Sequence, residues 1–371
     1  GLAFMTSQLT ASGAGRRNRI ELARELDRRG ATLSSRCDPE SQEVSLWGPS
    51  ESFGPLIEIL GDAVRAPRFD GADIERVRRQ CFEHQLRELT QPKHRAEREL
   101  LKAIFPIGHP YRLTGLGSRS SVSKIRRADL VRFHRDHFTR DGSQLIVTTA
   151  FPGEELRREL RRHWPRLDSR PAPAAPSSPG SRPHPPREVT VETPGRSQVE
   201  VLIGGPSIPR GSPDFPAAFL ANELLGGRPL LGRLFQRVRE SHGLAYHASS
   251  ELETMRWGGH WLAQAGTGPE RVQRVLPLLL DEVDRLGKEA VRPAELNRVR
   301  TSAIGEIPLS LETTAGAHEL AVEVAYYDLP TDFYRTWPST LNALTSEEVR
   351  AGAEHALGRV GASTVVVGPA R

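Results

Sequence analysis

One segment constrains the fold of this chain more than any other. Residues 168–187 read DSRPAPAAPSSPGSRPHPPR, which is dense in proline, serine and alanine and has no apolar periodicity. Such a composition favours an extended, polyproline-like chain and cannot bury a core. The chain has 371 residues, enough for two or three domains of about 100–200 residues each. We therefore predict two domains, 1–167 and 188–371, joined by the linker 168–187.

The two halves have similar patterns. Each contains amphipathic helices and ends in a short apolar strand, at 144–149 and at 363–368. A helix with an acidic cap precedes each strand, at 123–138 and from Leu344 onward. Periodicity also predicts helices at 21–29, 55–66, 214–225 and 272–286, and strand-like stretches at 31–46 and 189–203. This mixture predicts an α+β fold duplicated once, each domain a sandwich of helices on a mixed sheet.

Composition excludes several classes of protein. No window approaches the roughly 18–20 apolar residues of a membrane helix, so a membrane span is excluded. The net charge of +5 does not indicate nucleic-acid binding, because the arginines alternate with acidic residues, as at 157–162, which is typical of solvated helix faces. Two cysteines, Cys37 and Cys81, exclude a disulfide framework and are predicted core or incidental thiols. We expect a soluble protein, and the compartment, bacterial periplasm or cytoplasm, stays open.

The most specific pattern covers residues 220–253, LANELLGGRPLLGRLFQRVRESHGLAYHASSELE. It predicts a helix that ends at Gly226-Gly227, a second helix at 231–240, a break at Gly243 and a strand at 244–252. The string closely resembles the second domain of the pitrilysin/insulinase-like metallopeptidases, whose pattern is N-x-x-L-G-G-G followed by L-F-x-x-V-R-E-x-x-G-L-A-Y. His109-Pro110-Tyr111 with Gly117 is similar to a loop of that family's first domain.

The resemblance implies a lost zinc site. The family's motif is H-x-x-E-H, in which two histidines bind zinc and the glutamate activates water. Here the first helix opens GLAFMTSQ, so Phe4 and Gln8 stand at the ligand positions and Ser7 at the base position. Phenylalanine has no lone pair for a metal and serine has no carboxylate. The distal ligand aligns at His84, with Glu83 as the alternative register, and the first domain is expected to be truncated at its start.

One pair of histidines is a candidate for another metal site. His134 and His137 are three residues apart on a predicted helix, which places them on roughly the same face. They have no acidic third ligand in a suitable register. We therefore interpret them as a surface pair and predict no metal on this chain.

Two residues of the family's second motif are retained, Arg239 and Tyr246. The resemblance implies that they face the zinc of an active subunit across a closed chamber. The guanidinium would bind the substrate backbone, and the phenol would stabilise the developing oxyanion. From the residues alone another interpretation is open: Arg239 pairs with Glu240 or Glu251, and Tyr246 is half-buried packing.

The functional prediction follows from this contrast. Some bacterial members of the family are heterodimers, in which one subunit carries H-x-x-E-H and the other the arginine and tyrosine. The chain resembles the second kind, a subunit inactive alone that closes over an H-x-x-E-H paralogue and traps an extended peptide. It would bind no cofactor itself, and the zinc would be in the partner. The alternatives are a scaffold subunit without a role in proteolysis, a homodimer, or a zinc site upstream of residue 1.

Overall fold

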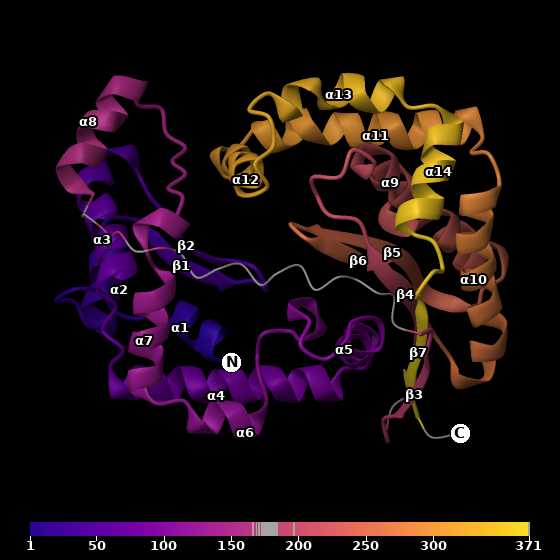
Figure 1. Ribbon diagram of the computed structural model, residues 1–371, viewed down its shortest axis with the longest axis horizontal. Helices are drawn as coiled ribbons and strands as arrows, with labels where there is room; N and C mark the ends of the chain where they lie inside the picture. Colours follow the sequence, from indigo (N-terminus) through magenta and orange to yellow (C-terminus); the bar gives the residue numbers. More distant parts are fainter. Residues whose placement is uncertain (165–166, 168, 170, 172–184, 196, 370–371) are drawn as a thin grey trace. The chain divides into compact units, whose positions relative to one another are not determined.

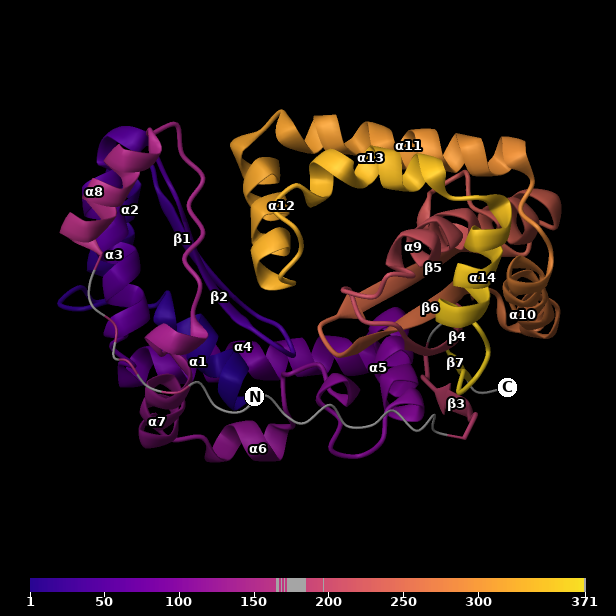
Figure 2. The same cartoon turned by 45° about the horizontal axis from the view of Figure 1, so that its top comes forward.

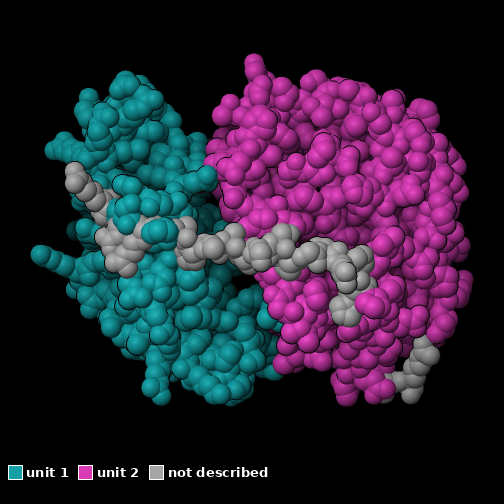
Figure 3. Space-filling model, in the orientation of Figure 1, with its two compact units in different colours: residues 1–87, 113–177 teal, residues 88–112, 178–371 magenta. Residues whose placement is uncertain are grey.

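The computed structural model describes residues 1–164, 167, 169, 171, 185–195 and 197–369. The chain divides into two compact units, residues 1–87 with 113–177 and residues 88–112 with 178–371, coloured separately in Figure 3. We call them unit 1 and unit 2. Residues 168, 170 and 172–184 of the predicted linker lie outside the described residues. The predicted domain boundaries therefore stay a prediction.

Unit 1 is mostly helical (Figure 1). Its strands are β1 (Thr32–Cys37) and β2 (Gln42–Trp47), which form an antiparallel hairpin. Its helices are α1 (Leu2–Thr10), α2 (Arg19–Arg28), α3 (Phe53–Arg65), most of α4 (Gly71–Thr90), α6 (Arg119–Lys124), α7 (Arg127–His137) and α8 (Gly153–His163). Helix α1 packs against β1 and α7, and its apolar side chains Met5 and Leu9 are buried in a core with α4 and α7.

Unit 2 is built on a five-stranded mixed sheet of order β3-β7-β4-β6-β5 (Figure 2). The strands are β3 (Glu188–Glu192), β4 (Val199–Ser207), β5 (Ala245–Met255), β6 (Gly258–Thr267) and β7 (Ser363–Gly368). Only the β3–β7 pair among these is parallel. The helices are α5 (Pro92–Ile104), α9 (Phe215–Asn222), α10 (Val272–Lys288), α11 (Pro293–Leu311), α12 (Thr314–Tyr326), α13 (Phe333–Ala343) and α14 (Ser346–Ala356).

The sheet of unit 2 is buried on both faces. Val201 and Ile203 of β4 join a core with α9, α10 and α14, whereas Leu202 joins a second core with α5. Successive side chains of a strand point to opposite faces, so a strand covered on both sides reads as a continuous apolar run. Helix α5 precedes the predicted linker in the chain and nevertheless packs against β4 and β7, which follow the linker.

Most of the predicted elements are confirmed. The helices at 21–29, 55–66, 214–225 and 272–286 are present, the last as α10, although the third gives way to a π-helix after Asn222. Helix α14 begins with the predicted capping box, in which the Thr345 side chain accepts from the Glu348 N–H and the Glu348 carboxylate accepts from the Thr345 N–H. The predicted mixed α/β architecture is confirmed, and none of the described helices is long and apolar enough to cross a membrane.

Two strand predictions are wrong. The apolar stretch 144–149 forms no strand in the described structure, and the stretch 189–203 is two strands, β3 and β4, rather than one. An extended segment becomes a strand only where a neighbouring edge takes its N–H and C=O groups. In the described part of unit 1 the sheet consists of β1 and β2 alone, which pair with each other. The two units thus differ in strand content, and the predicted duplication stays a prediction.

Helix α12 is held in place by a buried arginine. None of the described residues of α12 is fully buried, but its Glu323 is 2.6 Å from the Arg210 guanidinium, whose side chain is only 6% exposed. The guanidinium lies 3.8 Å from the ring centroid of Phe215, a cation–π contact. The Tyr334 hydroxyl donates to the same carboxylate, and burial raises the pKa of Tyr334.

We expect Arg210→Ala to lower the free energy of unfolding by about 3 kcal/mol, because it leaves the Glu323 carboxylate without its cation. The matched control is Arg335→Ala. Arg335 lies on α13, its side chain is 81% exposed, and it pairs with Asp332. Its removal should lower the free energy of unfolding by only about 0–1 kcal/mol. Urea unfolding followed by circular dichroism measures both. Equal losses in the two variants would show that the buried arginine anchors nothing.

Candidate functional site

The positions predicted as a lost zinc motif lie on α1, and their residues make contacts inside unit 1. The Ser7 hydroxyl, fully buried, donates to the backbone carbonyl of Arg36 at 3.1 Å. The Gln8 amide donates to the carbonyl of Ser35 at 3.3 Å. Both acceptors belong to β1. The side chains at two of the three motif positions therefore attach α1 to the hairpin.

The distal position also lies beside this motif. The His84 ring on α4 is 6.0 Å from the ring centroid of Phe4. His84 and Glu83 are both exposed, and of the two it is His84 whose ring faces Phe4. The structure thus brings together all four positions that the sequence singled out, Phe4, Ser7, Gln8 and His84.

These side chains do not fit a zinc ion. Zinc in proteins takes cysteine, histidine or carboxylate ligands, and this set offers one imidazole with a phenyl ring, a hydroxyl and an amide. The hydroxyl and the amide already bond to carbonyls of β1. Elsewhere in the described residues no group of three or more histidine, cysteine, aspartate or glutamate side chains is placed to hold a metal.

The other histidines and cysteines singled out by sequence have local contacts. A ring nitrogen of His134 bonds to the Val64 carbonyl at 2.8 Å, and one of His137 bonds to the Phe133 carbonyl at 2.9 Å. Burial raises the pKa of the Cys37 thiol to about 11 and also raises that of Cys81. Both thiols therefore stay protonated and unreactive near neutral pH.

His109, in the loop that the sequence singled out, has a packing role. Its ring stacks on Phe105, with centroids 4.4 Å apart, and its Nδ1 accepts from the Tyr111 N–H at 3.1 Å. The buried Tyr111 hydroxyl accepts in turn from the Trp257 N–H at 3.3 Å. This loop fastens α5 to the β5–β6 turn within unit 2.

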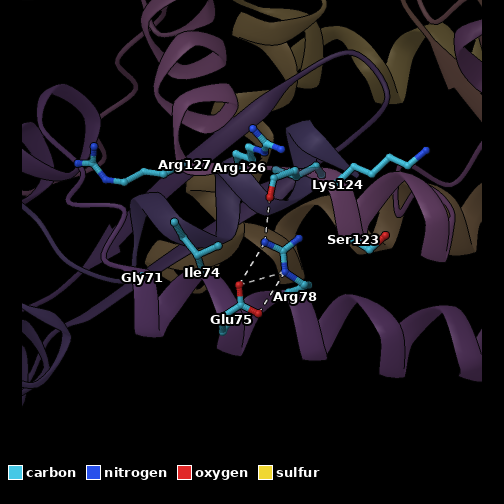
Figure 4. Close-up of a pocket in the computed structure, with 9 residues that line it drawn as sticks. Gly71, Ile74, Glu75, Arg78, Ser123, Lys124, Arg126 and Arg127 are labelled. Atoms are coloured by element: carbon cyan, nitrogen blue, oxygen red, sulfur yellow. Dashed lines mark hydrogen bonds and ion pairs between the residues drawn. The ribbon is translucent and has the colours of Figure 1, made fainter.

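A surface hollow in unit 1 contains none of the predicted site residues. It has a volume of about 550 Å³ and is lined by Gly71, Ile74, Glu75, Arg78 and residues 123–127. Figure 4 shows its Arg78 guanidinium against Glu75. Arg78 also donates to the Ile125 carbonyl at 2.9 Å. The Arg78 guanidinium thus has its partners within unit 1.

Arg239 lies on a π-helix. The 220–253 motif forms η4 (Glu223–Gly227) and η5 (Phe235–Ser241), both π-helices, a rare geometry that is frequent at functional sites. The glycines of the motif allow this packing: a Cβ on Gly226 would lie 2.6 Å from the Ser250 nitrogen, and one on Gly232 would lie 2.6 Å from the Gly226 Cα. The sequence predicted helices here, and the structure shows in addition that these turns have π-helical geometry.

Ion pairs to α10 and α11 fix the orientation of η5. Glu282 of α10, whose side chain is 4% exposed, lies 2.7 Å from Arg237 and 3.6 Å from Arg233. Arg233 also makes two hydrogen bonds to Glu295, at 2.7 and 2.9 Å. A bidentate pair of this kind fixes direction as well as distance. The helix that carries Arg239 is therefore held by its neighbours rather than by its own exposed side chains.

Arg239 itself is different from the arginines around it. Arg228, Arg233 and Arg237 all pair with carboxylates. Arg239 is exposed and lies over the Phe235 ring at 5.1 Å from the centroid, and within the described residues no carboxylate pairs with it. The alternative of a pair with Glu240 or Glu251 is not found, since the nearest cation of Glu251 is Lys93, at 3.6 Å.

Tyr246 follows a tight turn after η5. Gly243 has φ +62°, and the N–H groups of Gly243 and Leu244 donate to the carbonyls of Arg239 and Val238, each at 3.0 Å. A left-handed residue at the end of a helix favours glycine. The buried Leu244 and Val238 side chains anchor this turn in the core.

Tyr246 is the extra residue of a β-bulge. Ala245 is in register with Thr267, and His247 with Gly266, so Tyr246 has no partner on β6. Bulges re-aim side chains and are frequent next to active sites. The side chain is 61% exposed, and in the described part of the chain its hydroxyl has no hydrogen-bond partner. Half-buried packing, the alternative interpretation, is therefore not what the structure shows.

Arg239 and Tyr246 thus stand at the two ends of one fixed turn, each with unused hydrogen-bond donors. Such an arrangement can bind carbonyl or carboxylate oxygens of a ligand. Sequence reasoning found both residues through the motif. It missed Glu282, because the contact crosses 45 residues of chain and no local pattern records it.

Comparison with known proteins agrees with this picture. Residues 124–303 match the family model described as the Peptidase M16 inactive domain. An uncharacterized zinc protease of Mycobacterium bovis is 26% identical over 366 residues, covering 97% of this chain and 82% of the relative. The mitochondrial-processing peptidase subunit beta of Neurospora crassa is 23% identical over 351 residues, covering 87% and 70% respectively. A solved peptidase M16 inactive domain from Pseudomonas fluorescens superposes with a TM-score of 0.90 at 22% identity, covering all of this chain and 89% of that one.

The fold is a mixed α/β architecture similar to that of solved M16 inactive domains. The chain is a relative of the M16 peptidases and matches their inactive domain, as the resemblance to the pitrilysin/insulinase-like family predicted.

We expect the purified chain to bind no stoichiometric zinc after dialysis against dilute zinc, because Phe4 and Gln8 stand at the positions of the two histidine ligands and Ser7 at that of the glutamate base. Metal analysis by mass spectrometry measures the content, and close to one equivalent per chain would contradict the prediction. The triple variant Phe4→His, Ser7→Glu, Gln8→His should also bind zinc poorly, since His84 stands where a carboxylate is required and the Ser7 position is fully buried.

Proposed function

We propose that this chain is a non-catalytic subunit of a zinc-dependent heterodimeric peptidase. The observation that carries the proposal is a contrast within the molecule. The side chains of Ser7 and Gln8 at the lost zinc motif are bonded to the chain itself, whereas Arg239 and Tyr246 are exposed with donors left over. The chain has thus lost the groups that activate water and kept groups that bind a substrate.

In this proposal an active partner with H-x-x-E-H holds the zinc and the water. Arg239 donates to a backbone carbonyl of an extended peptide and fixes its register. The Tyr246 hydroxyl donates to the oxygen on which negative charge develops during hydrolysis. Preorganised donors of this kind stabilise a transition state because they need no reorientation during the reaction. The ion pairs at Glu282 and the turn at Gly243 supply that preorganisation.

The relatives support a role in proteolysis without defining it. One is named a zinc protease and another a peptidase subunit, and the matching domain is described as inactive. A scaffold subunit with no role in proteolysis is the competing function. It gives no reason for an exposed, unpaired arginine and tyrosine at the two ends of a rigid turn, and the experiment below separates the two functions.

The test uses the chain mixed with a paralogue that carries H-x-x-E-H. Tyr246→Phe should lower kcat of the mixture by about 10²–10³, which is the usual effect of removing one oxyanion donor. Arg239→Ala should mainly raise KM, because it weakens substrate capture. The matched control is Arg274→Ala, an exposed arginine of α10 that should change neither constant.

Assembly of each variant is checked by gel filtration, and neither subunit alone should cleave the peptide. Wild-type kinetics in both variants, with unchanged assembly, would contradict the proposal and leave the scaffold function.

A further inference from the structure

A carboxylate and an imidazole meet across three neighbouring strands directly beside Tyr246. Glu200 of β4 is in register with Gly266 of β6, and Gly266 is in register with His247 of β5. The Nε2 of His247 lies 3.3 Å from Oε2 of Glu200, so the two side chains reach each other over the middle strand. The Glu200 side chain is 9% exposed and that of His247 is 43% exposed.

Only a glycine at 266 leaves room for this contact. A Cβ on Gly266 would lie 2.5 Å from Cε1 and 2.7 Å from Nδ1 of the His247 ring, and 3.2 Å from Oε1 of Glu200. Real Cβ atoms do not approach a ring this closely, so any larger residue would displace His247. A glycine inside a strand commonly marks a bulge or a close approach of other groups, and here both occur together.

Burial of the Glu200 carboxylate favours its contact with His247. A carboxylate removed from water is costly unless a cation or hydrogen-bond donors accompany it. Among the described residues, His247 is the basic side chain that lies within 4.0 Å of Glu200, and its imidazole is a cation only when it is protonated. The two atoms are close but not aligned as a hydrogen bond, since neither has a hydrogen-bond partner in the structure. The contact places the His247 ring over Gly266, beside the bulge.

The opposite side of the bulge is fixed as well. The hydroxyl of Thr267, which is fully buried, donates to the Leu244 carbonyl at 2.5 Å. Thr267 is also in register with Ala245. The residue before Tyr246 and the residue after it are thus both held by β6, and the extra residue has little freedom to leave the bulge.

We propose that Glu200, Gly266 and His247 form a strand clamp that positions Tyr246 for its role in the mixed peptidase. The clamp residues do not touch the substrate; they act through the backbone of the bulge. This inference rests on the proposed function for its consequence in catalysis, whereas the positioning of Tyr246 is a property of this chain alone.

The first measurement uses the full chain without a partner. Tyrosine occurs five times in the sequence, so labelling with 3-fluorotyrosine gives five ¹⁹F signals, of which Tyr246→Phe identifies one. Glu200→Gln keeps the shape and removes the charge, and Gly266→Ala forces the His247 ring to move. Both should shift the Tyr246 signal and leave the other four in place. Glu253→Gln is the matched control, since it neutralises a glutamate on β5 farther from Tyr246 and should shift nothing at Tyr246.

The second measurement is steady-state kinetics of the mixed subunits. Glu200→Gln and Gly266→Ala should lower kcat by about 10–100-fold, the scale expected when a catalytic group is displaced by about 1 Å, with a smaller change in KM. Circular dichroism and gel filtration check folding and assembly. Glu200→Gln carries the test if Gly266→Ala does not fold.

The outcomes separate the two proposals. If Tyr246→Phe lowers kcat but the clamp variants leave both the ¹⁹F signal and kcat unchanged, the clamp is wrong and the proposed function stands. If Tyr246→Phe lowers kcat, and a clamp variant shifts the Tyr246 signal but keeps the wild-type kcat, the clamp's role in catalysis is also overturned. If Tyr246→Phe itself leaves kcat unchanged, the proposed function fails, and the ¹⁹F shift alone then decides whether the clamp positions Tyr246.

Discussion

Unit 2 depends on burying strand β4 on both faces. Residues 199–205 are all buried, and full burial of one large aliphatic side chain contributes roughly 1.5–3 kcal/mol. One helix layer, of α9, α10 and α14, covers Val201 and Ile203, and α5 covers Leu202. The need for a second cover explains why residues 88–112 belong to unit 2, although they precede the proline-rich segment by more than fifty residues. Helix α5 therefore packs with strands that are distant from it in the sequence, because it covers an apolar face of β4.

Glu200 is the exception within that buried run, and it connects the core to the site. A charged residue in the middle of an apolar strand needs a compensating group, and the structure supplies His247 across Gly266. The same strand order that buries β4 therefore also sets β5, the strand that carries the bulge. On the other side of the turn, Glu282 of the core-facing helix α10 orients η5. The segments that carry Arg239 and Tyr246 are thus held by contacts to two buried glutamates, Glu282 and Glu200.

The sequence predicted what is local and missed what is distant. The amphipathic helices, the Thr345–Glu348 capping box and the residues Arg239 and Tyr246 were all accessible, because each depends on a short run of neighbouring residues. The strand at 144–149 failed because strand formation depends on an available edge, which no periodicity reports. The bulge at Tyr246 and the Glu282 and Glu200 contacts involve pairs separated by tens of residues. The π-helices are local, but the sequence predicted them only as helices. The glycines were the one sign in the sequence of these distant contacts, since Gly226 and Gly266 lie where backbone or ring atoms leave no room for a Cβ.

The residues at the predicted zinc-motif positions are part of the packing of unit 1. Ser7 is fully buried and donates to β1; a glutamate there would place a carboxylate in a position with no cation provided, at a cost of several kcal/mol. Gln8 donates to the same strand, and Phe4 packs against the exposed His84. Each replacement has acquired a contact that the metal ligand would have to give up. Building a zinc site at these positions would therefore require repacking α1 against β1 and α4, whereas the proposed function, with the zinc in a second subunit, requires no change in unit 1.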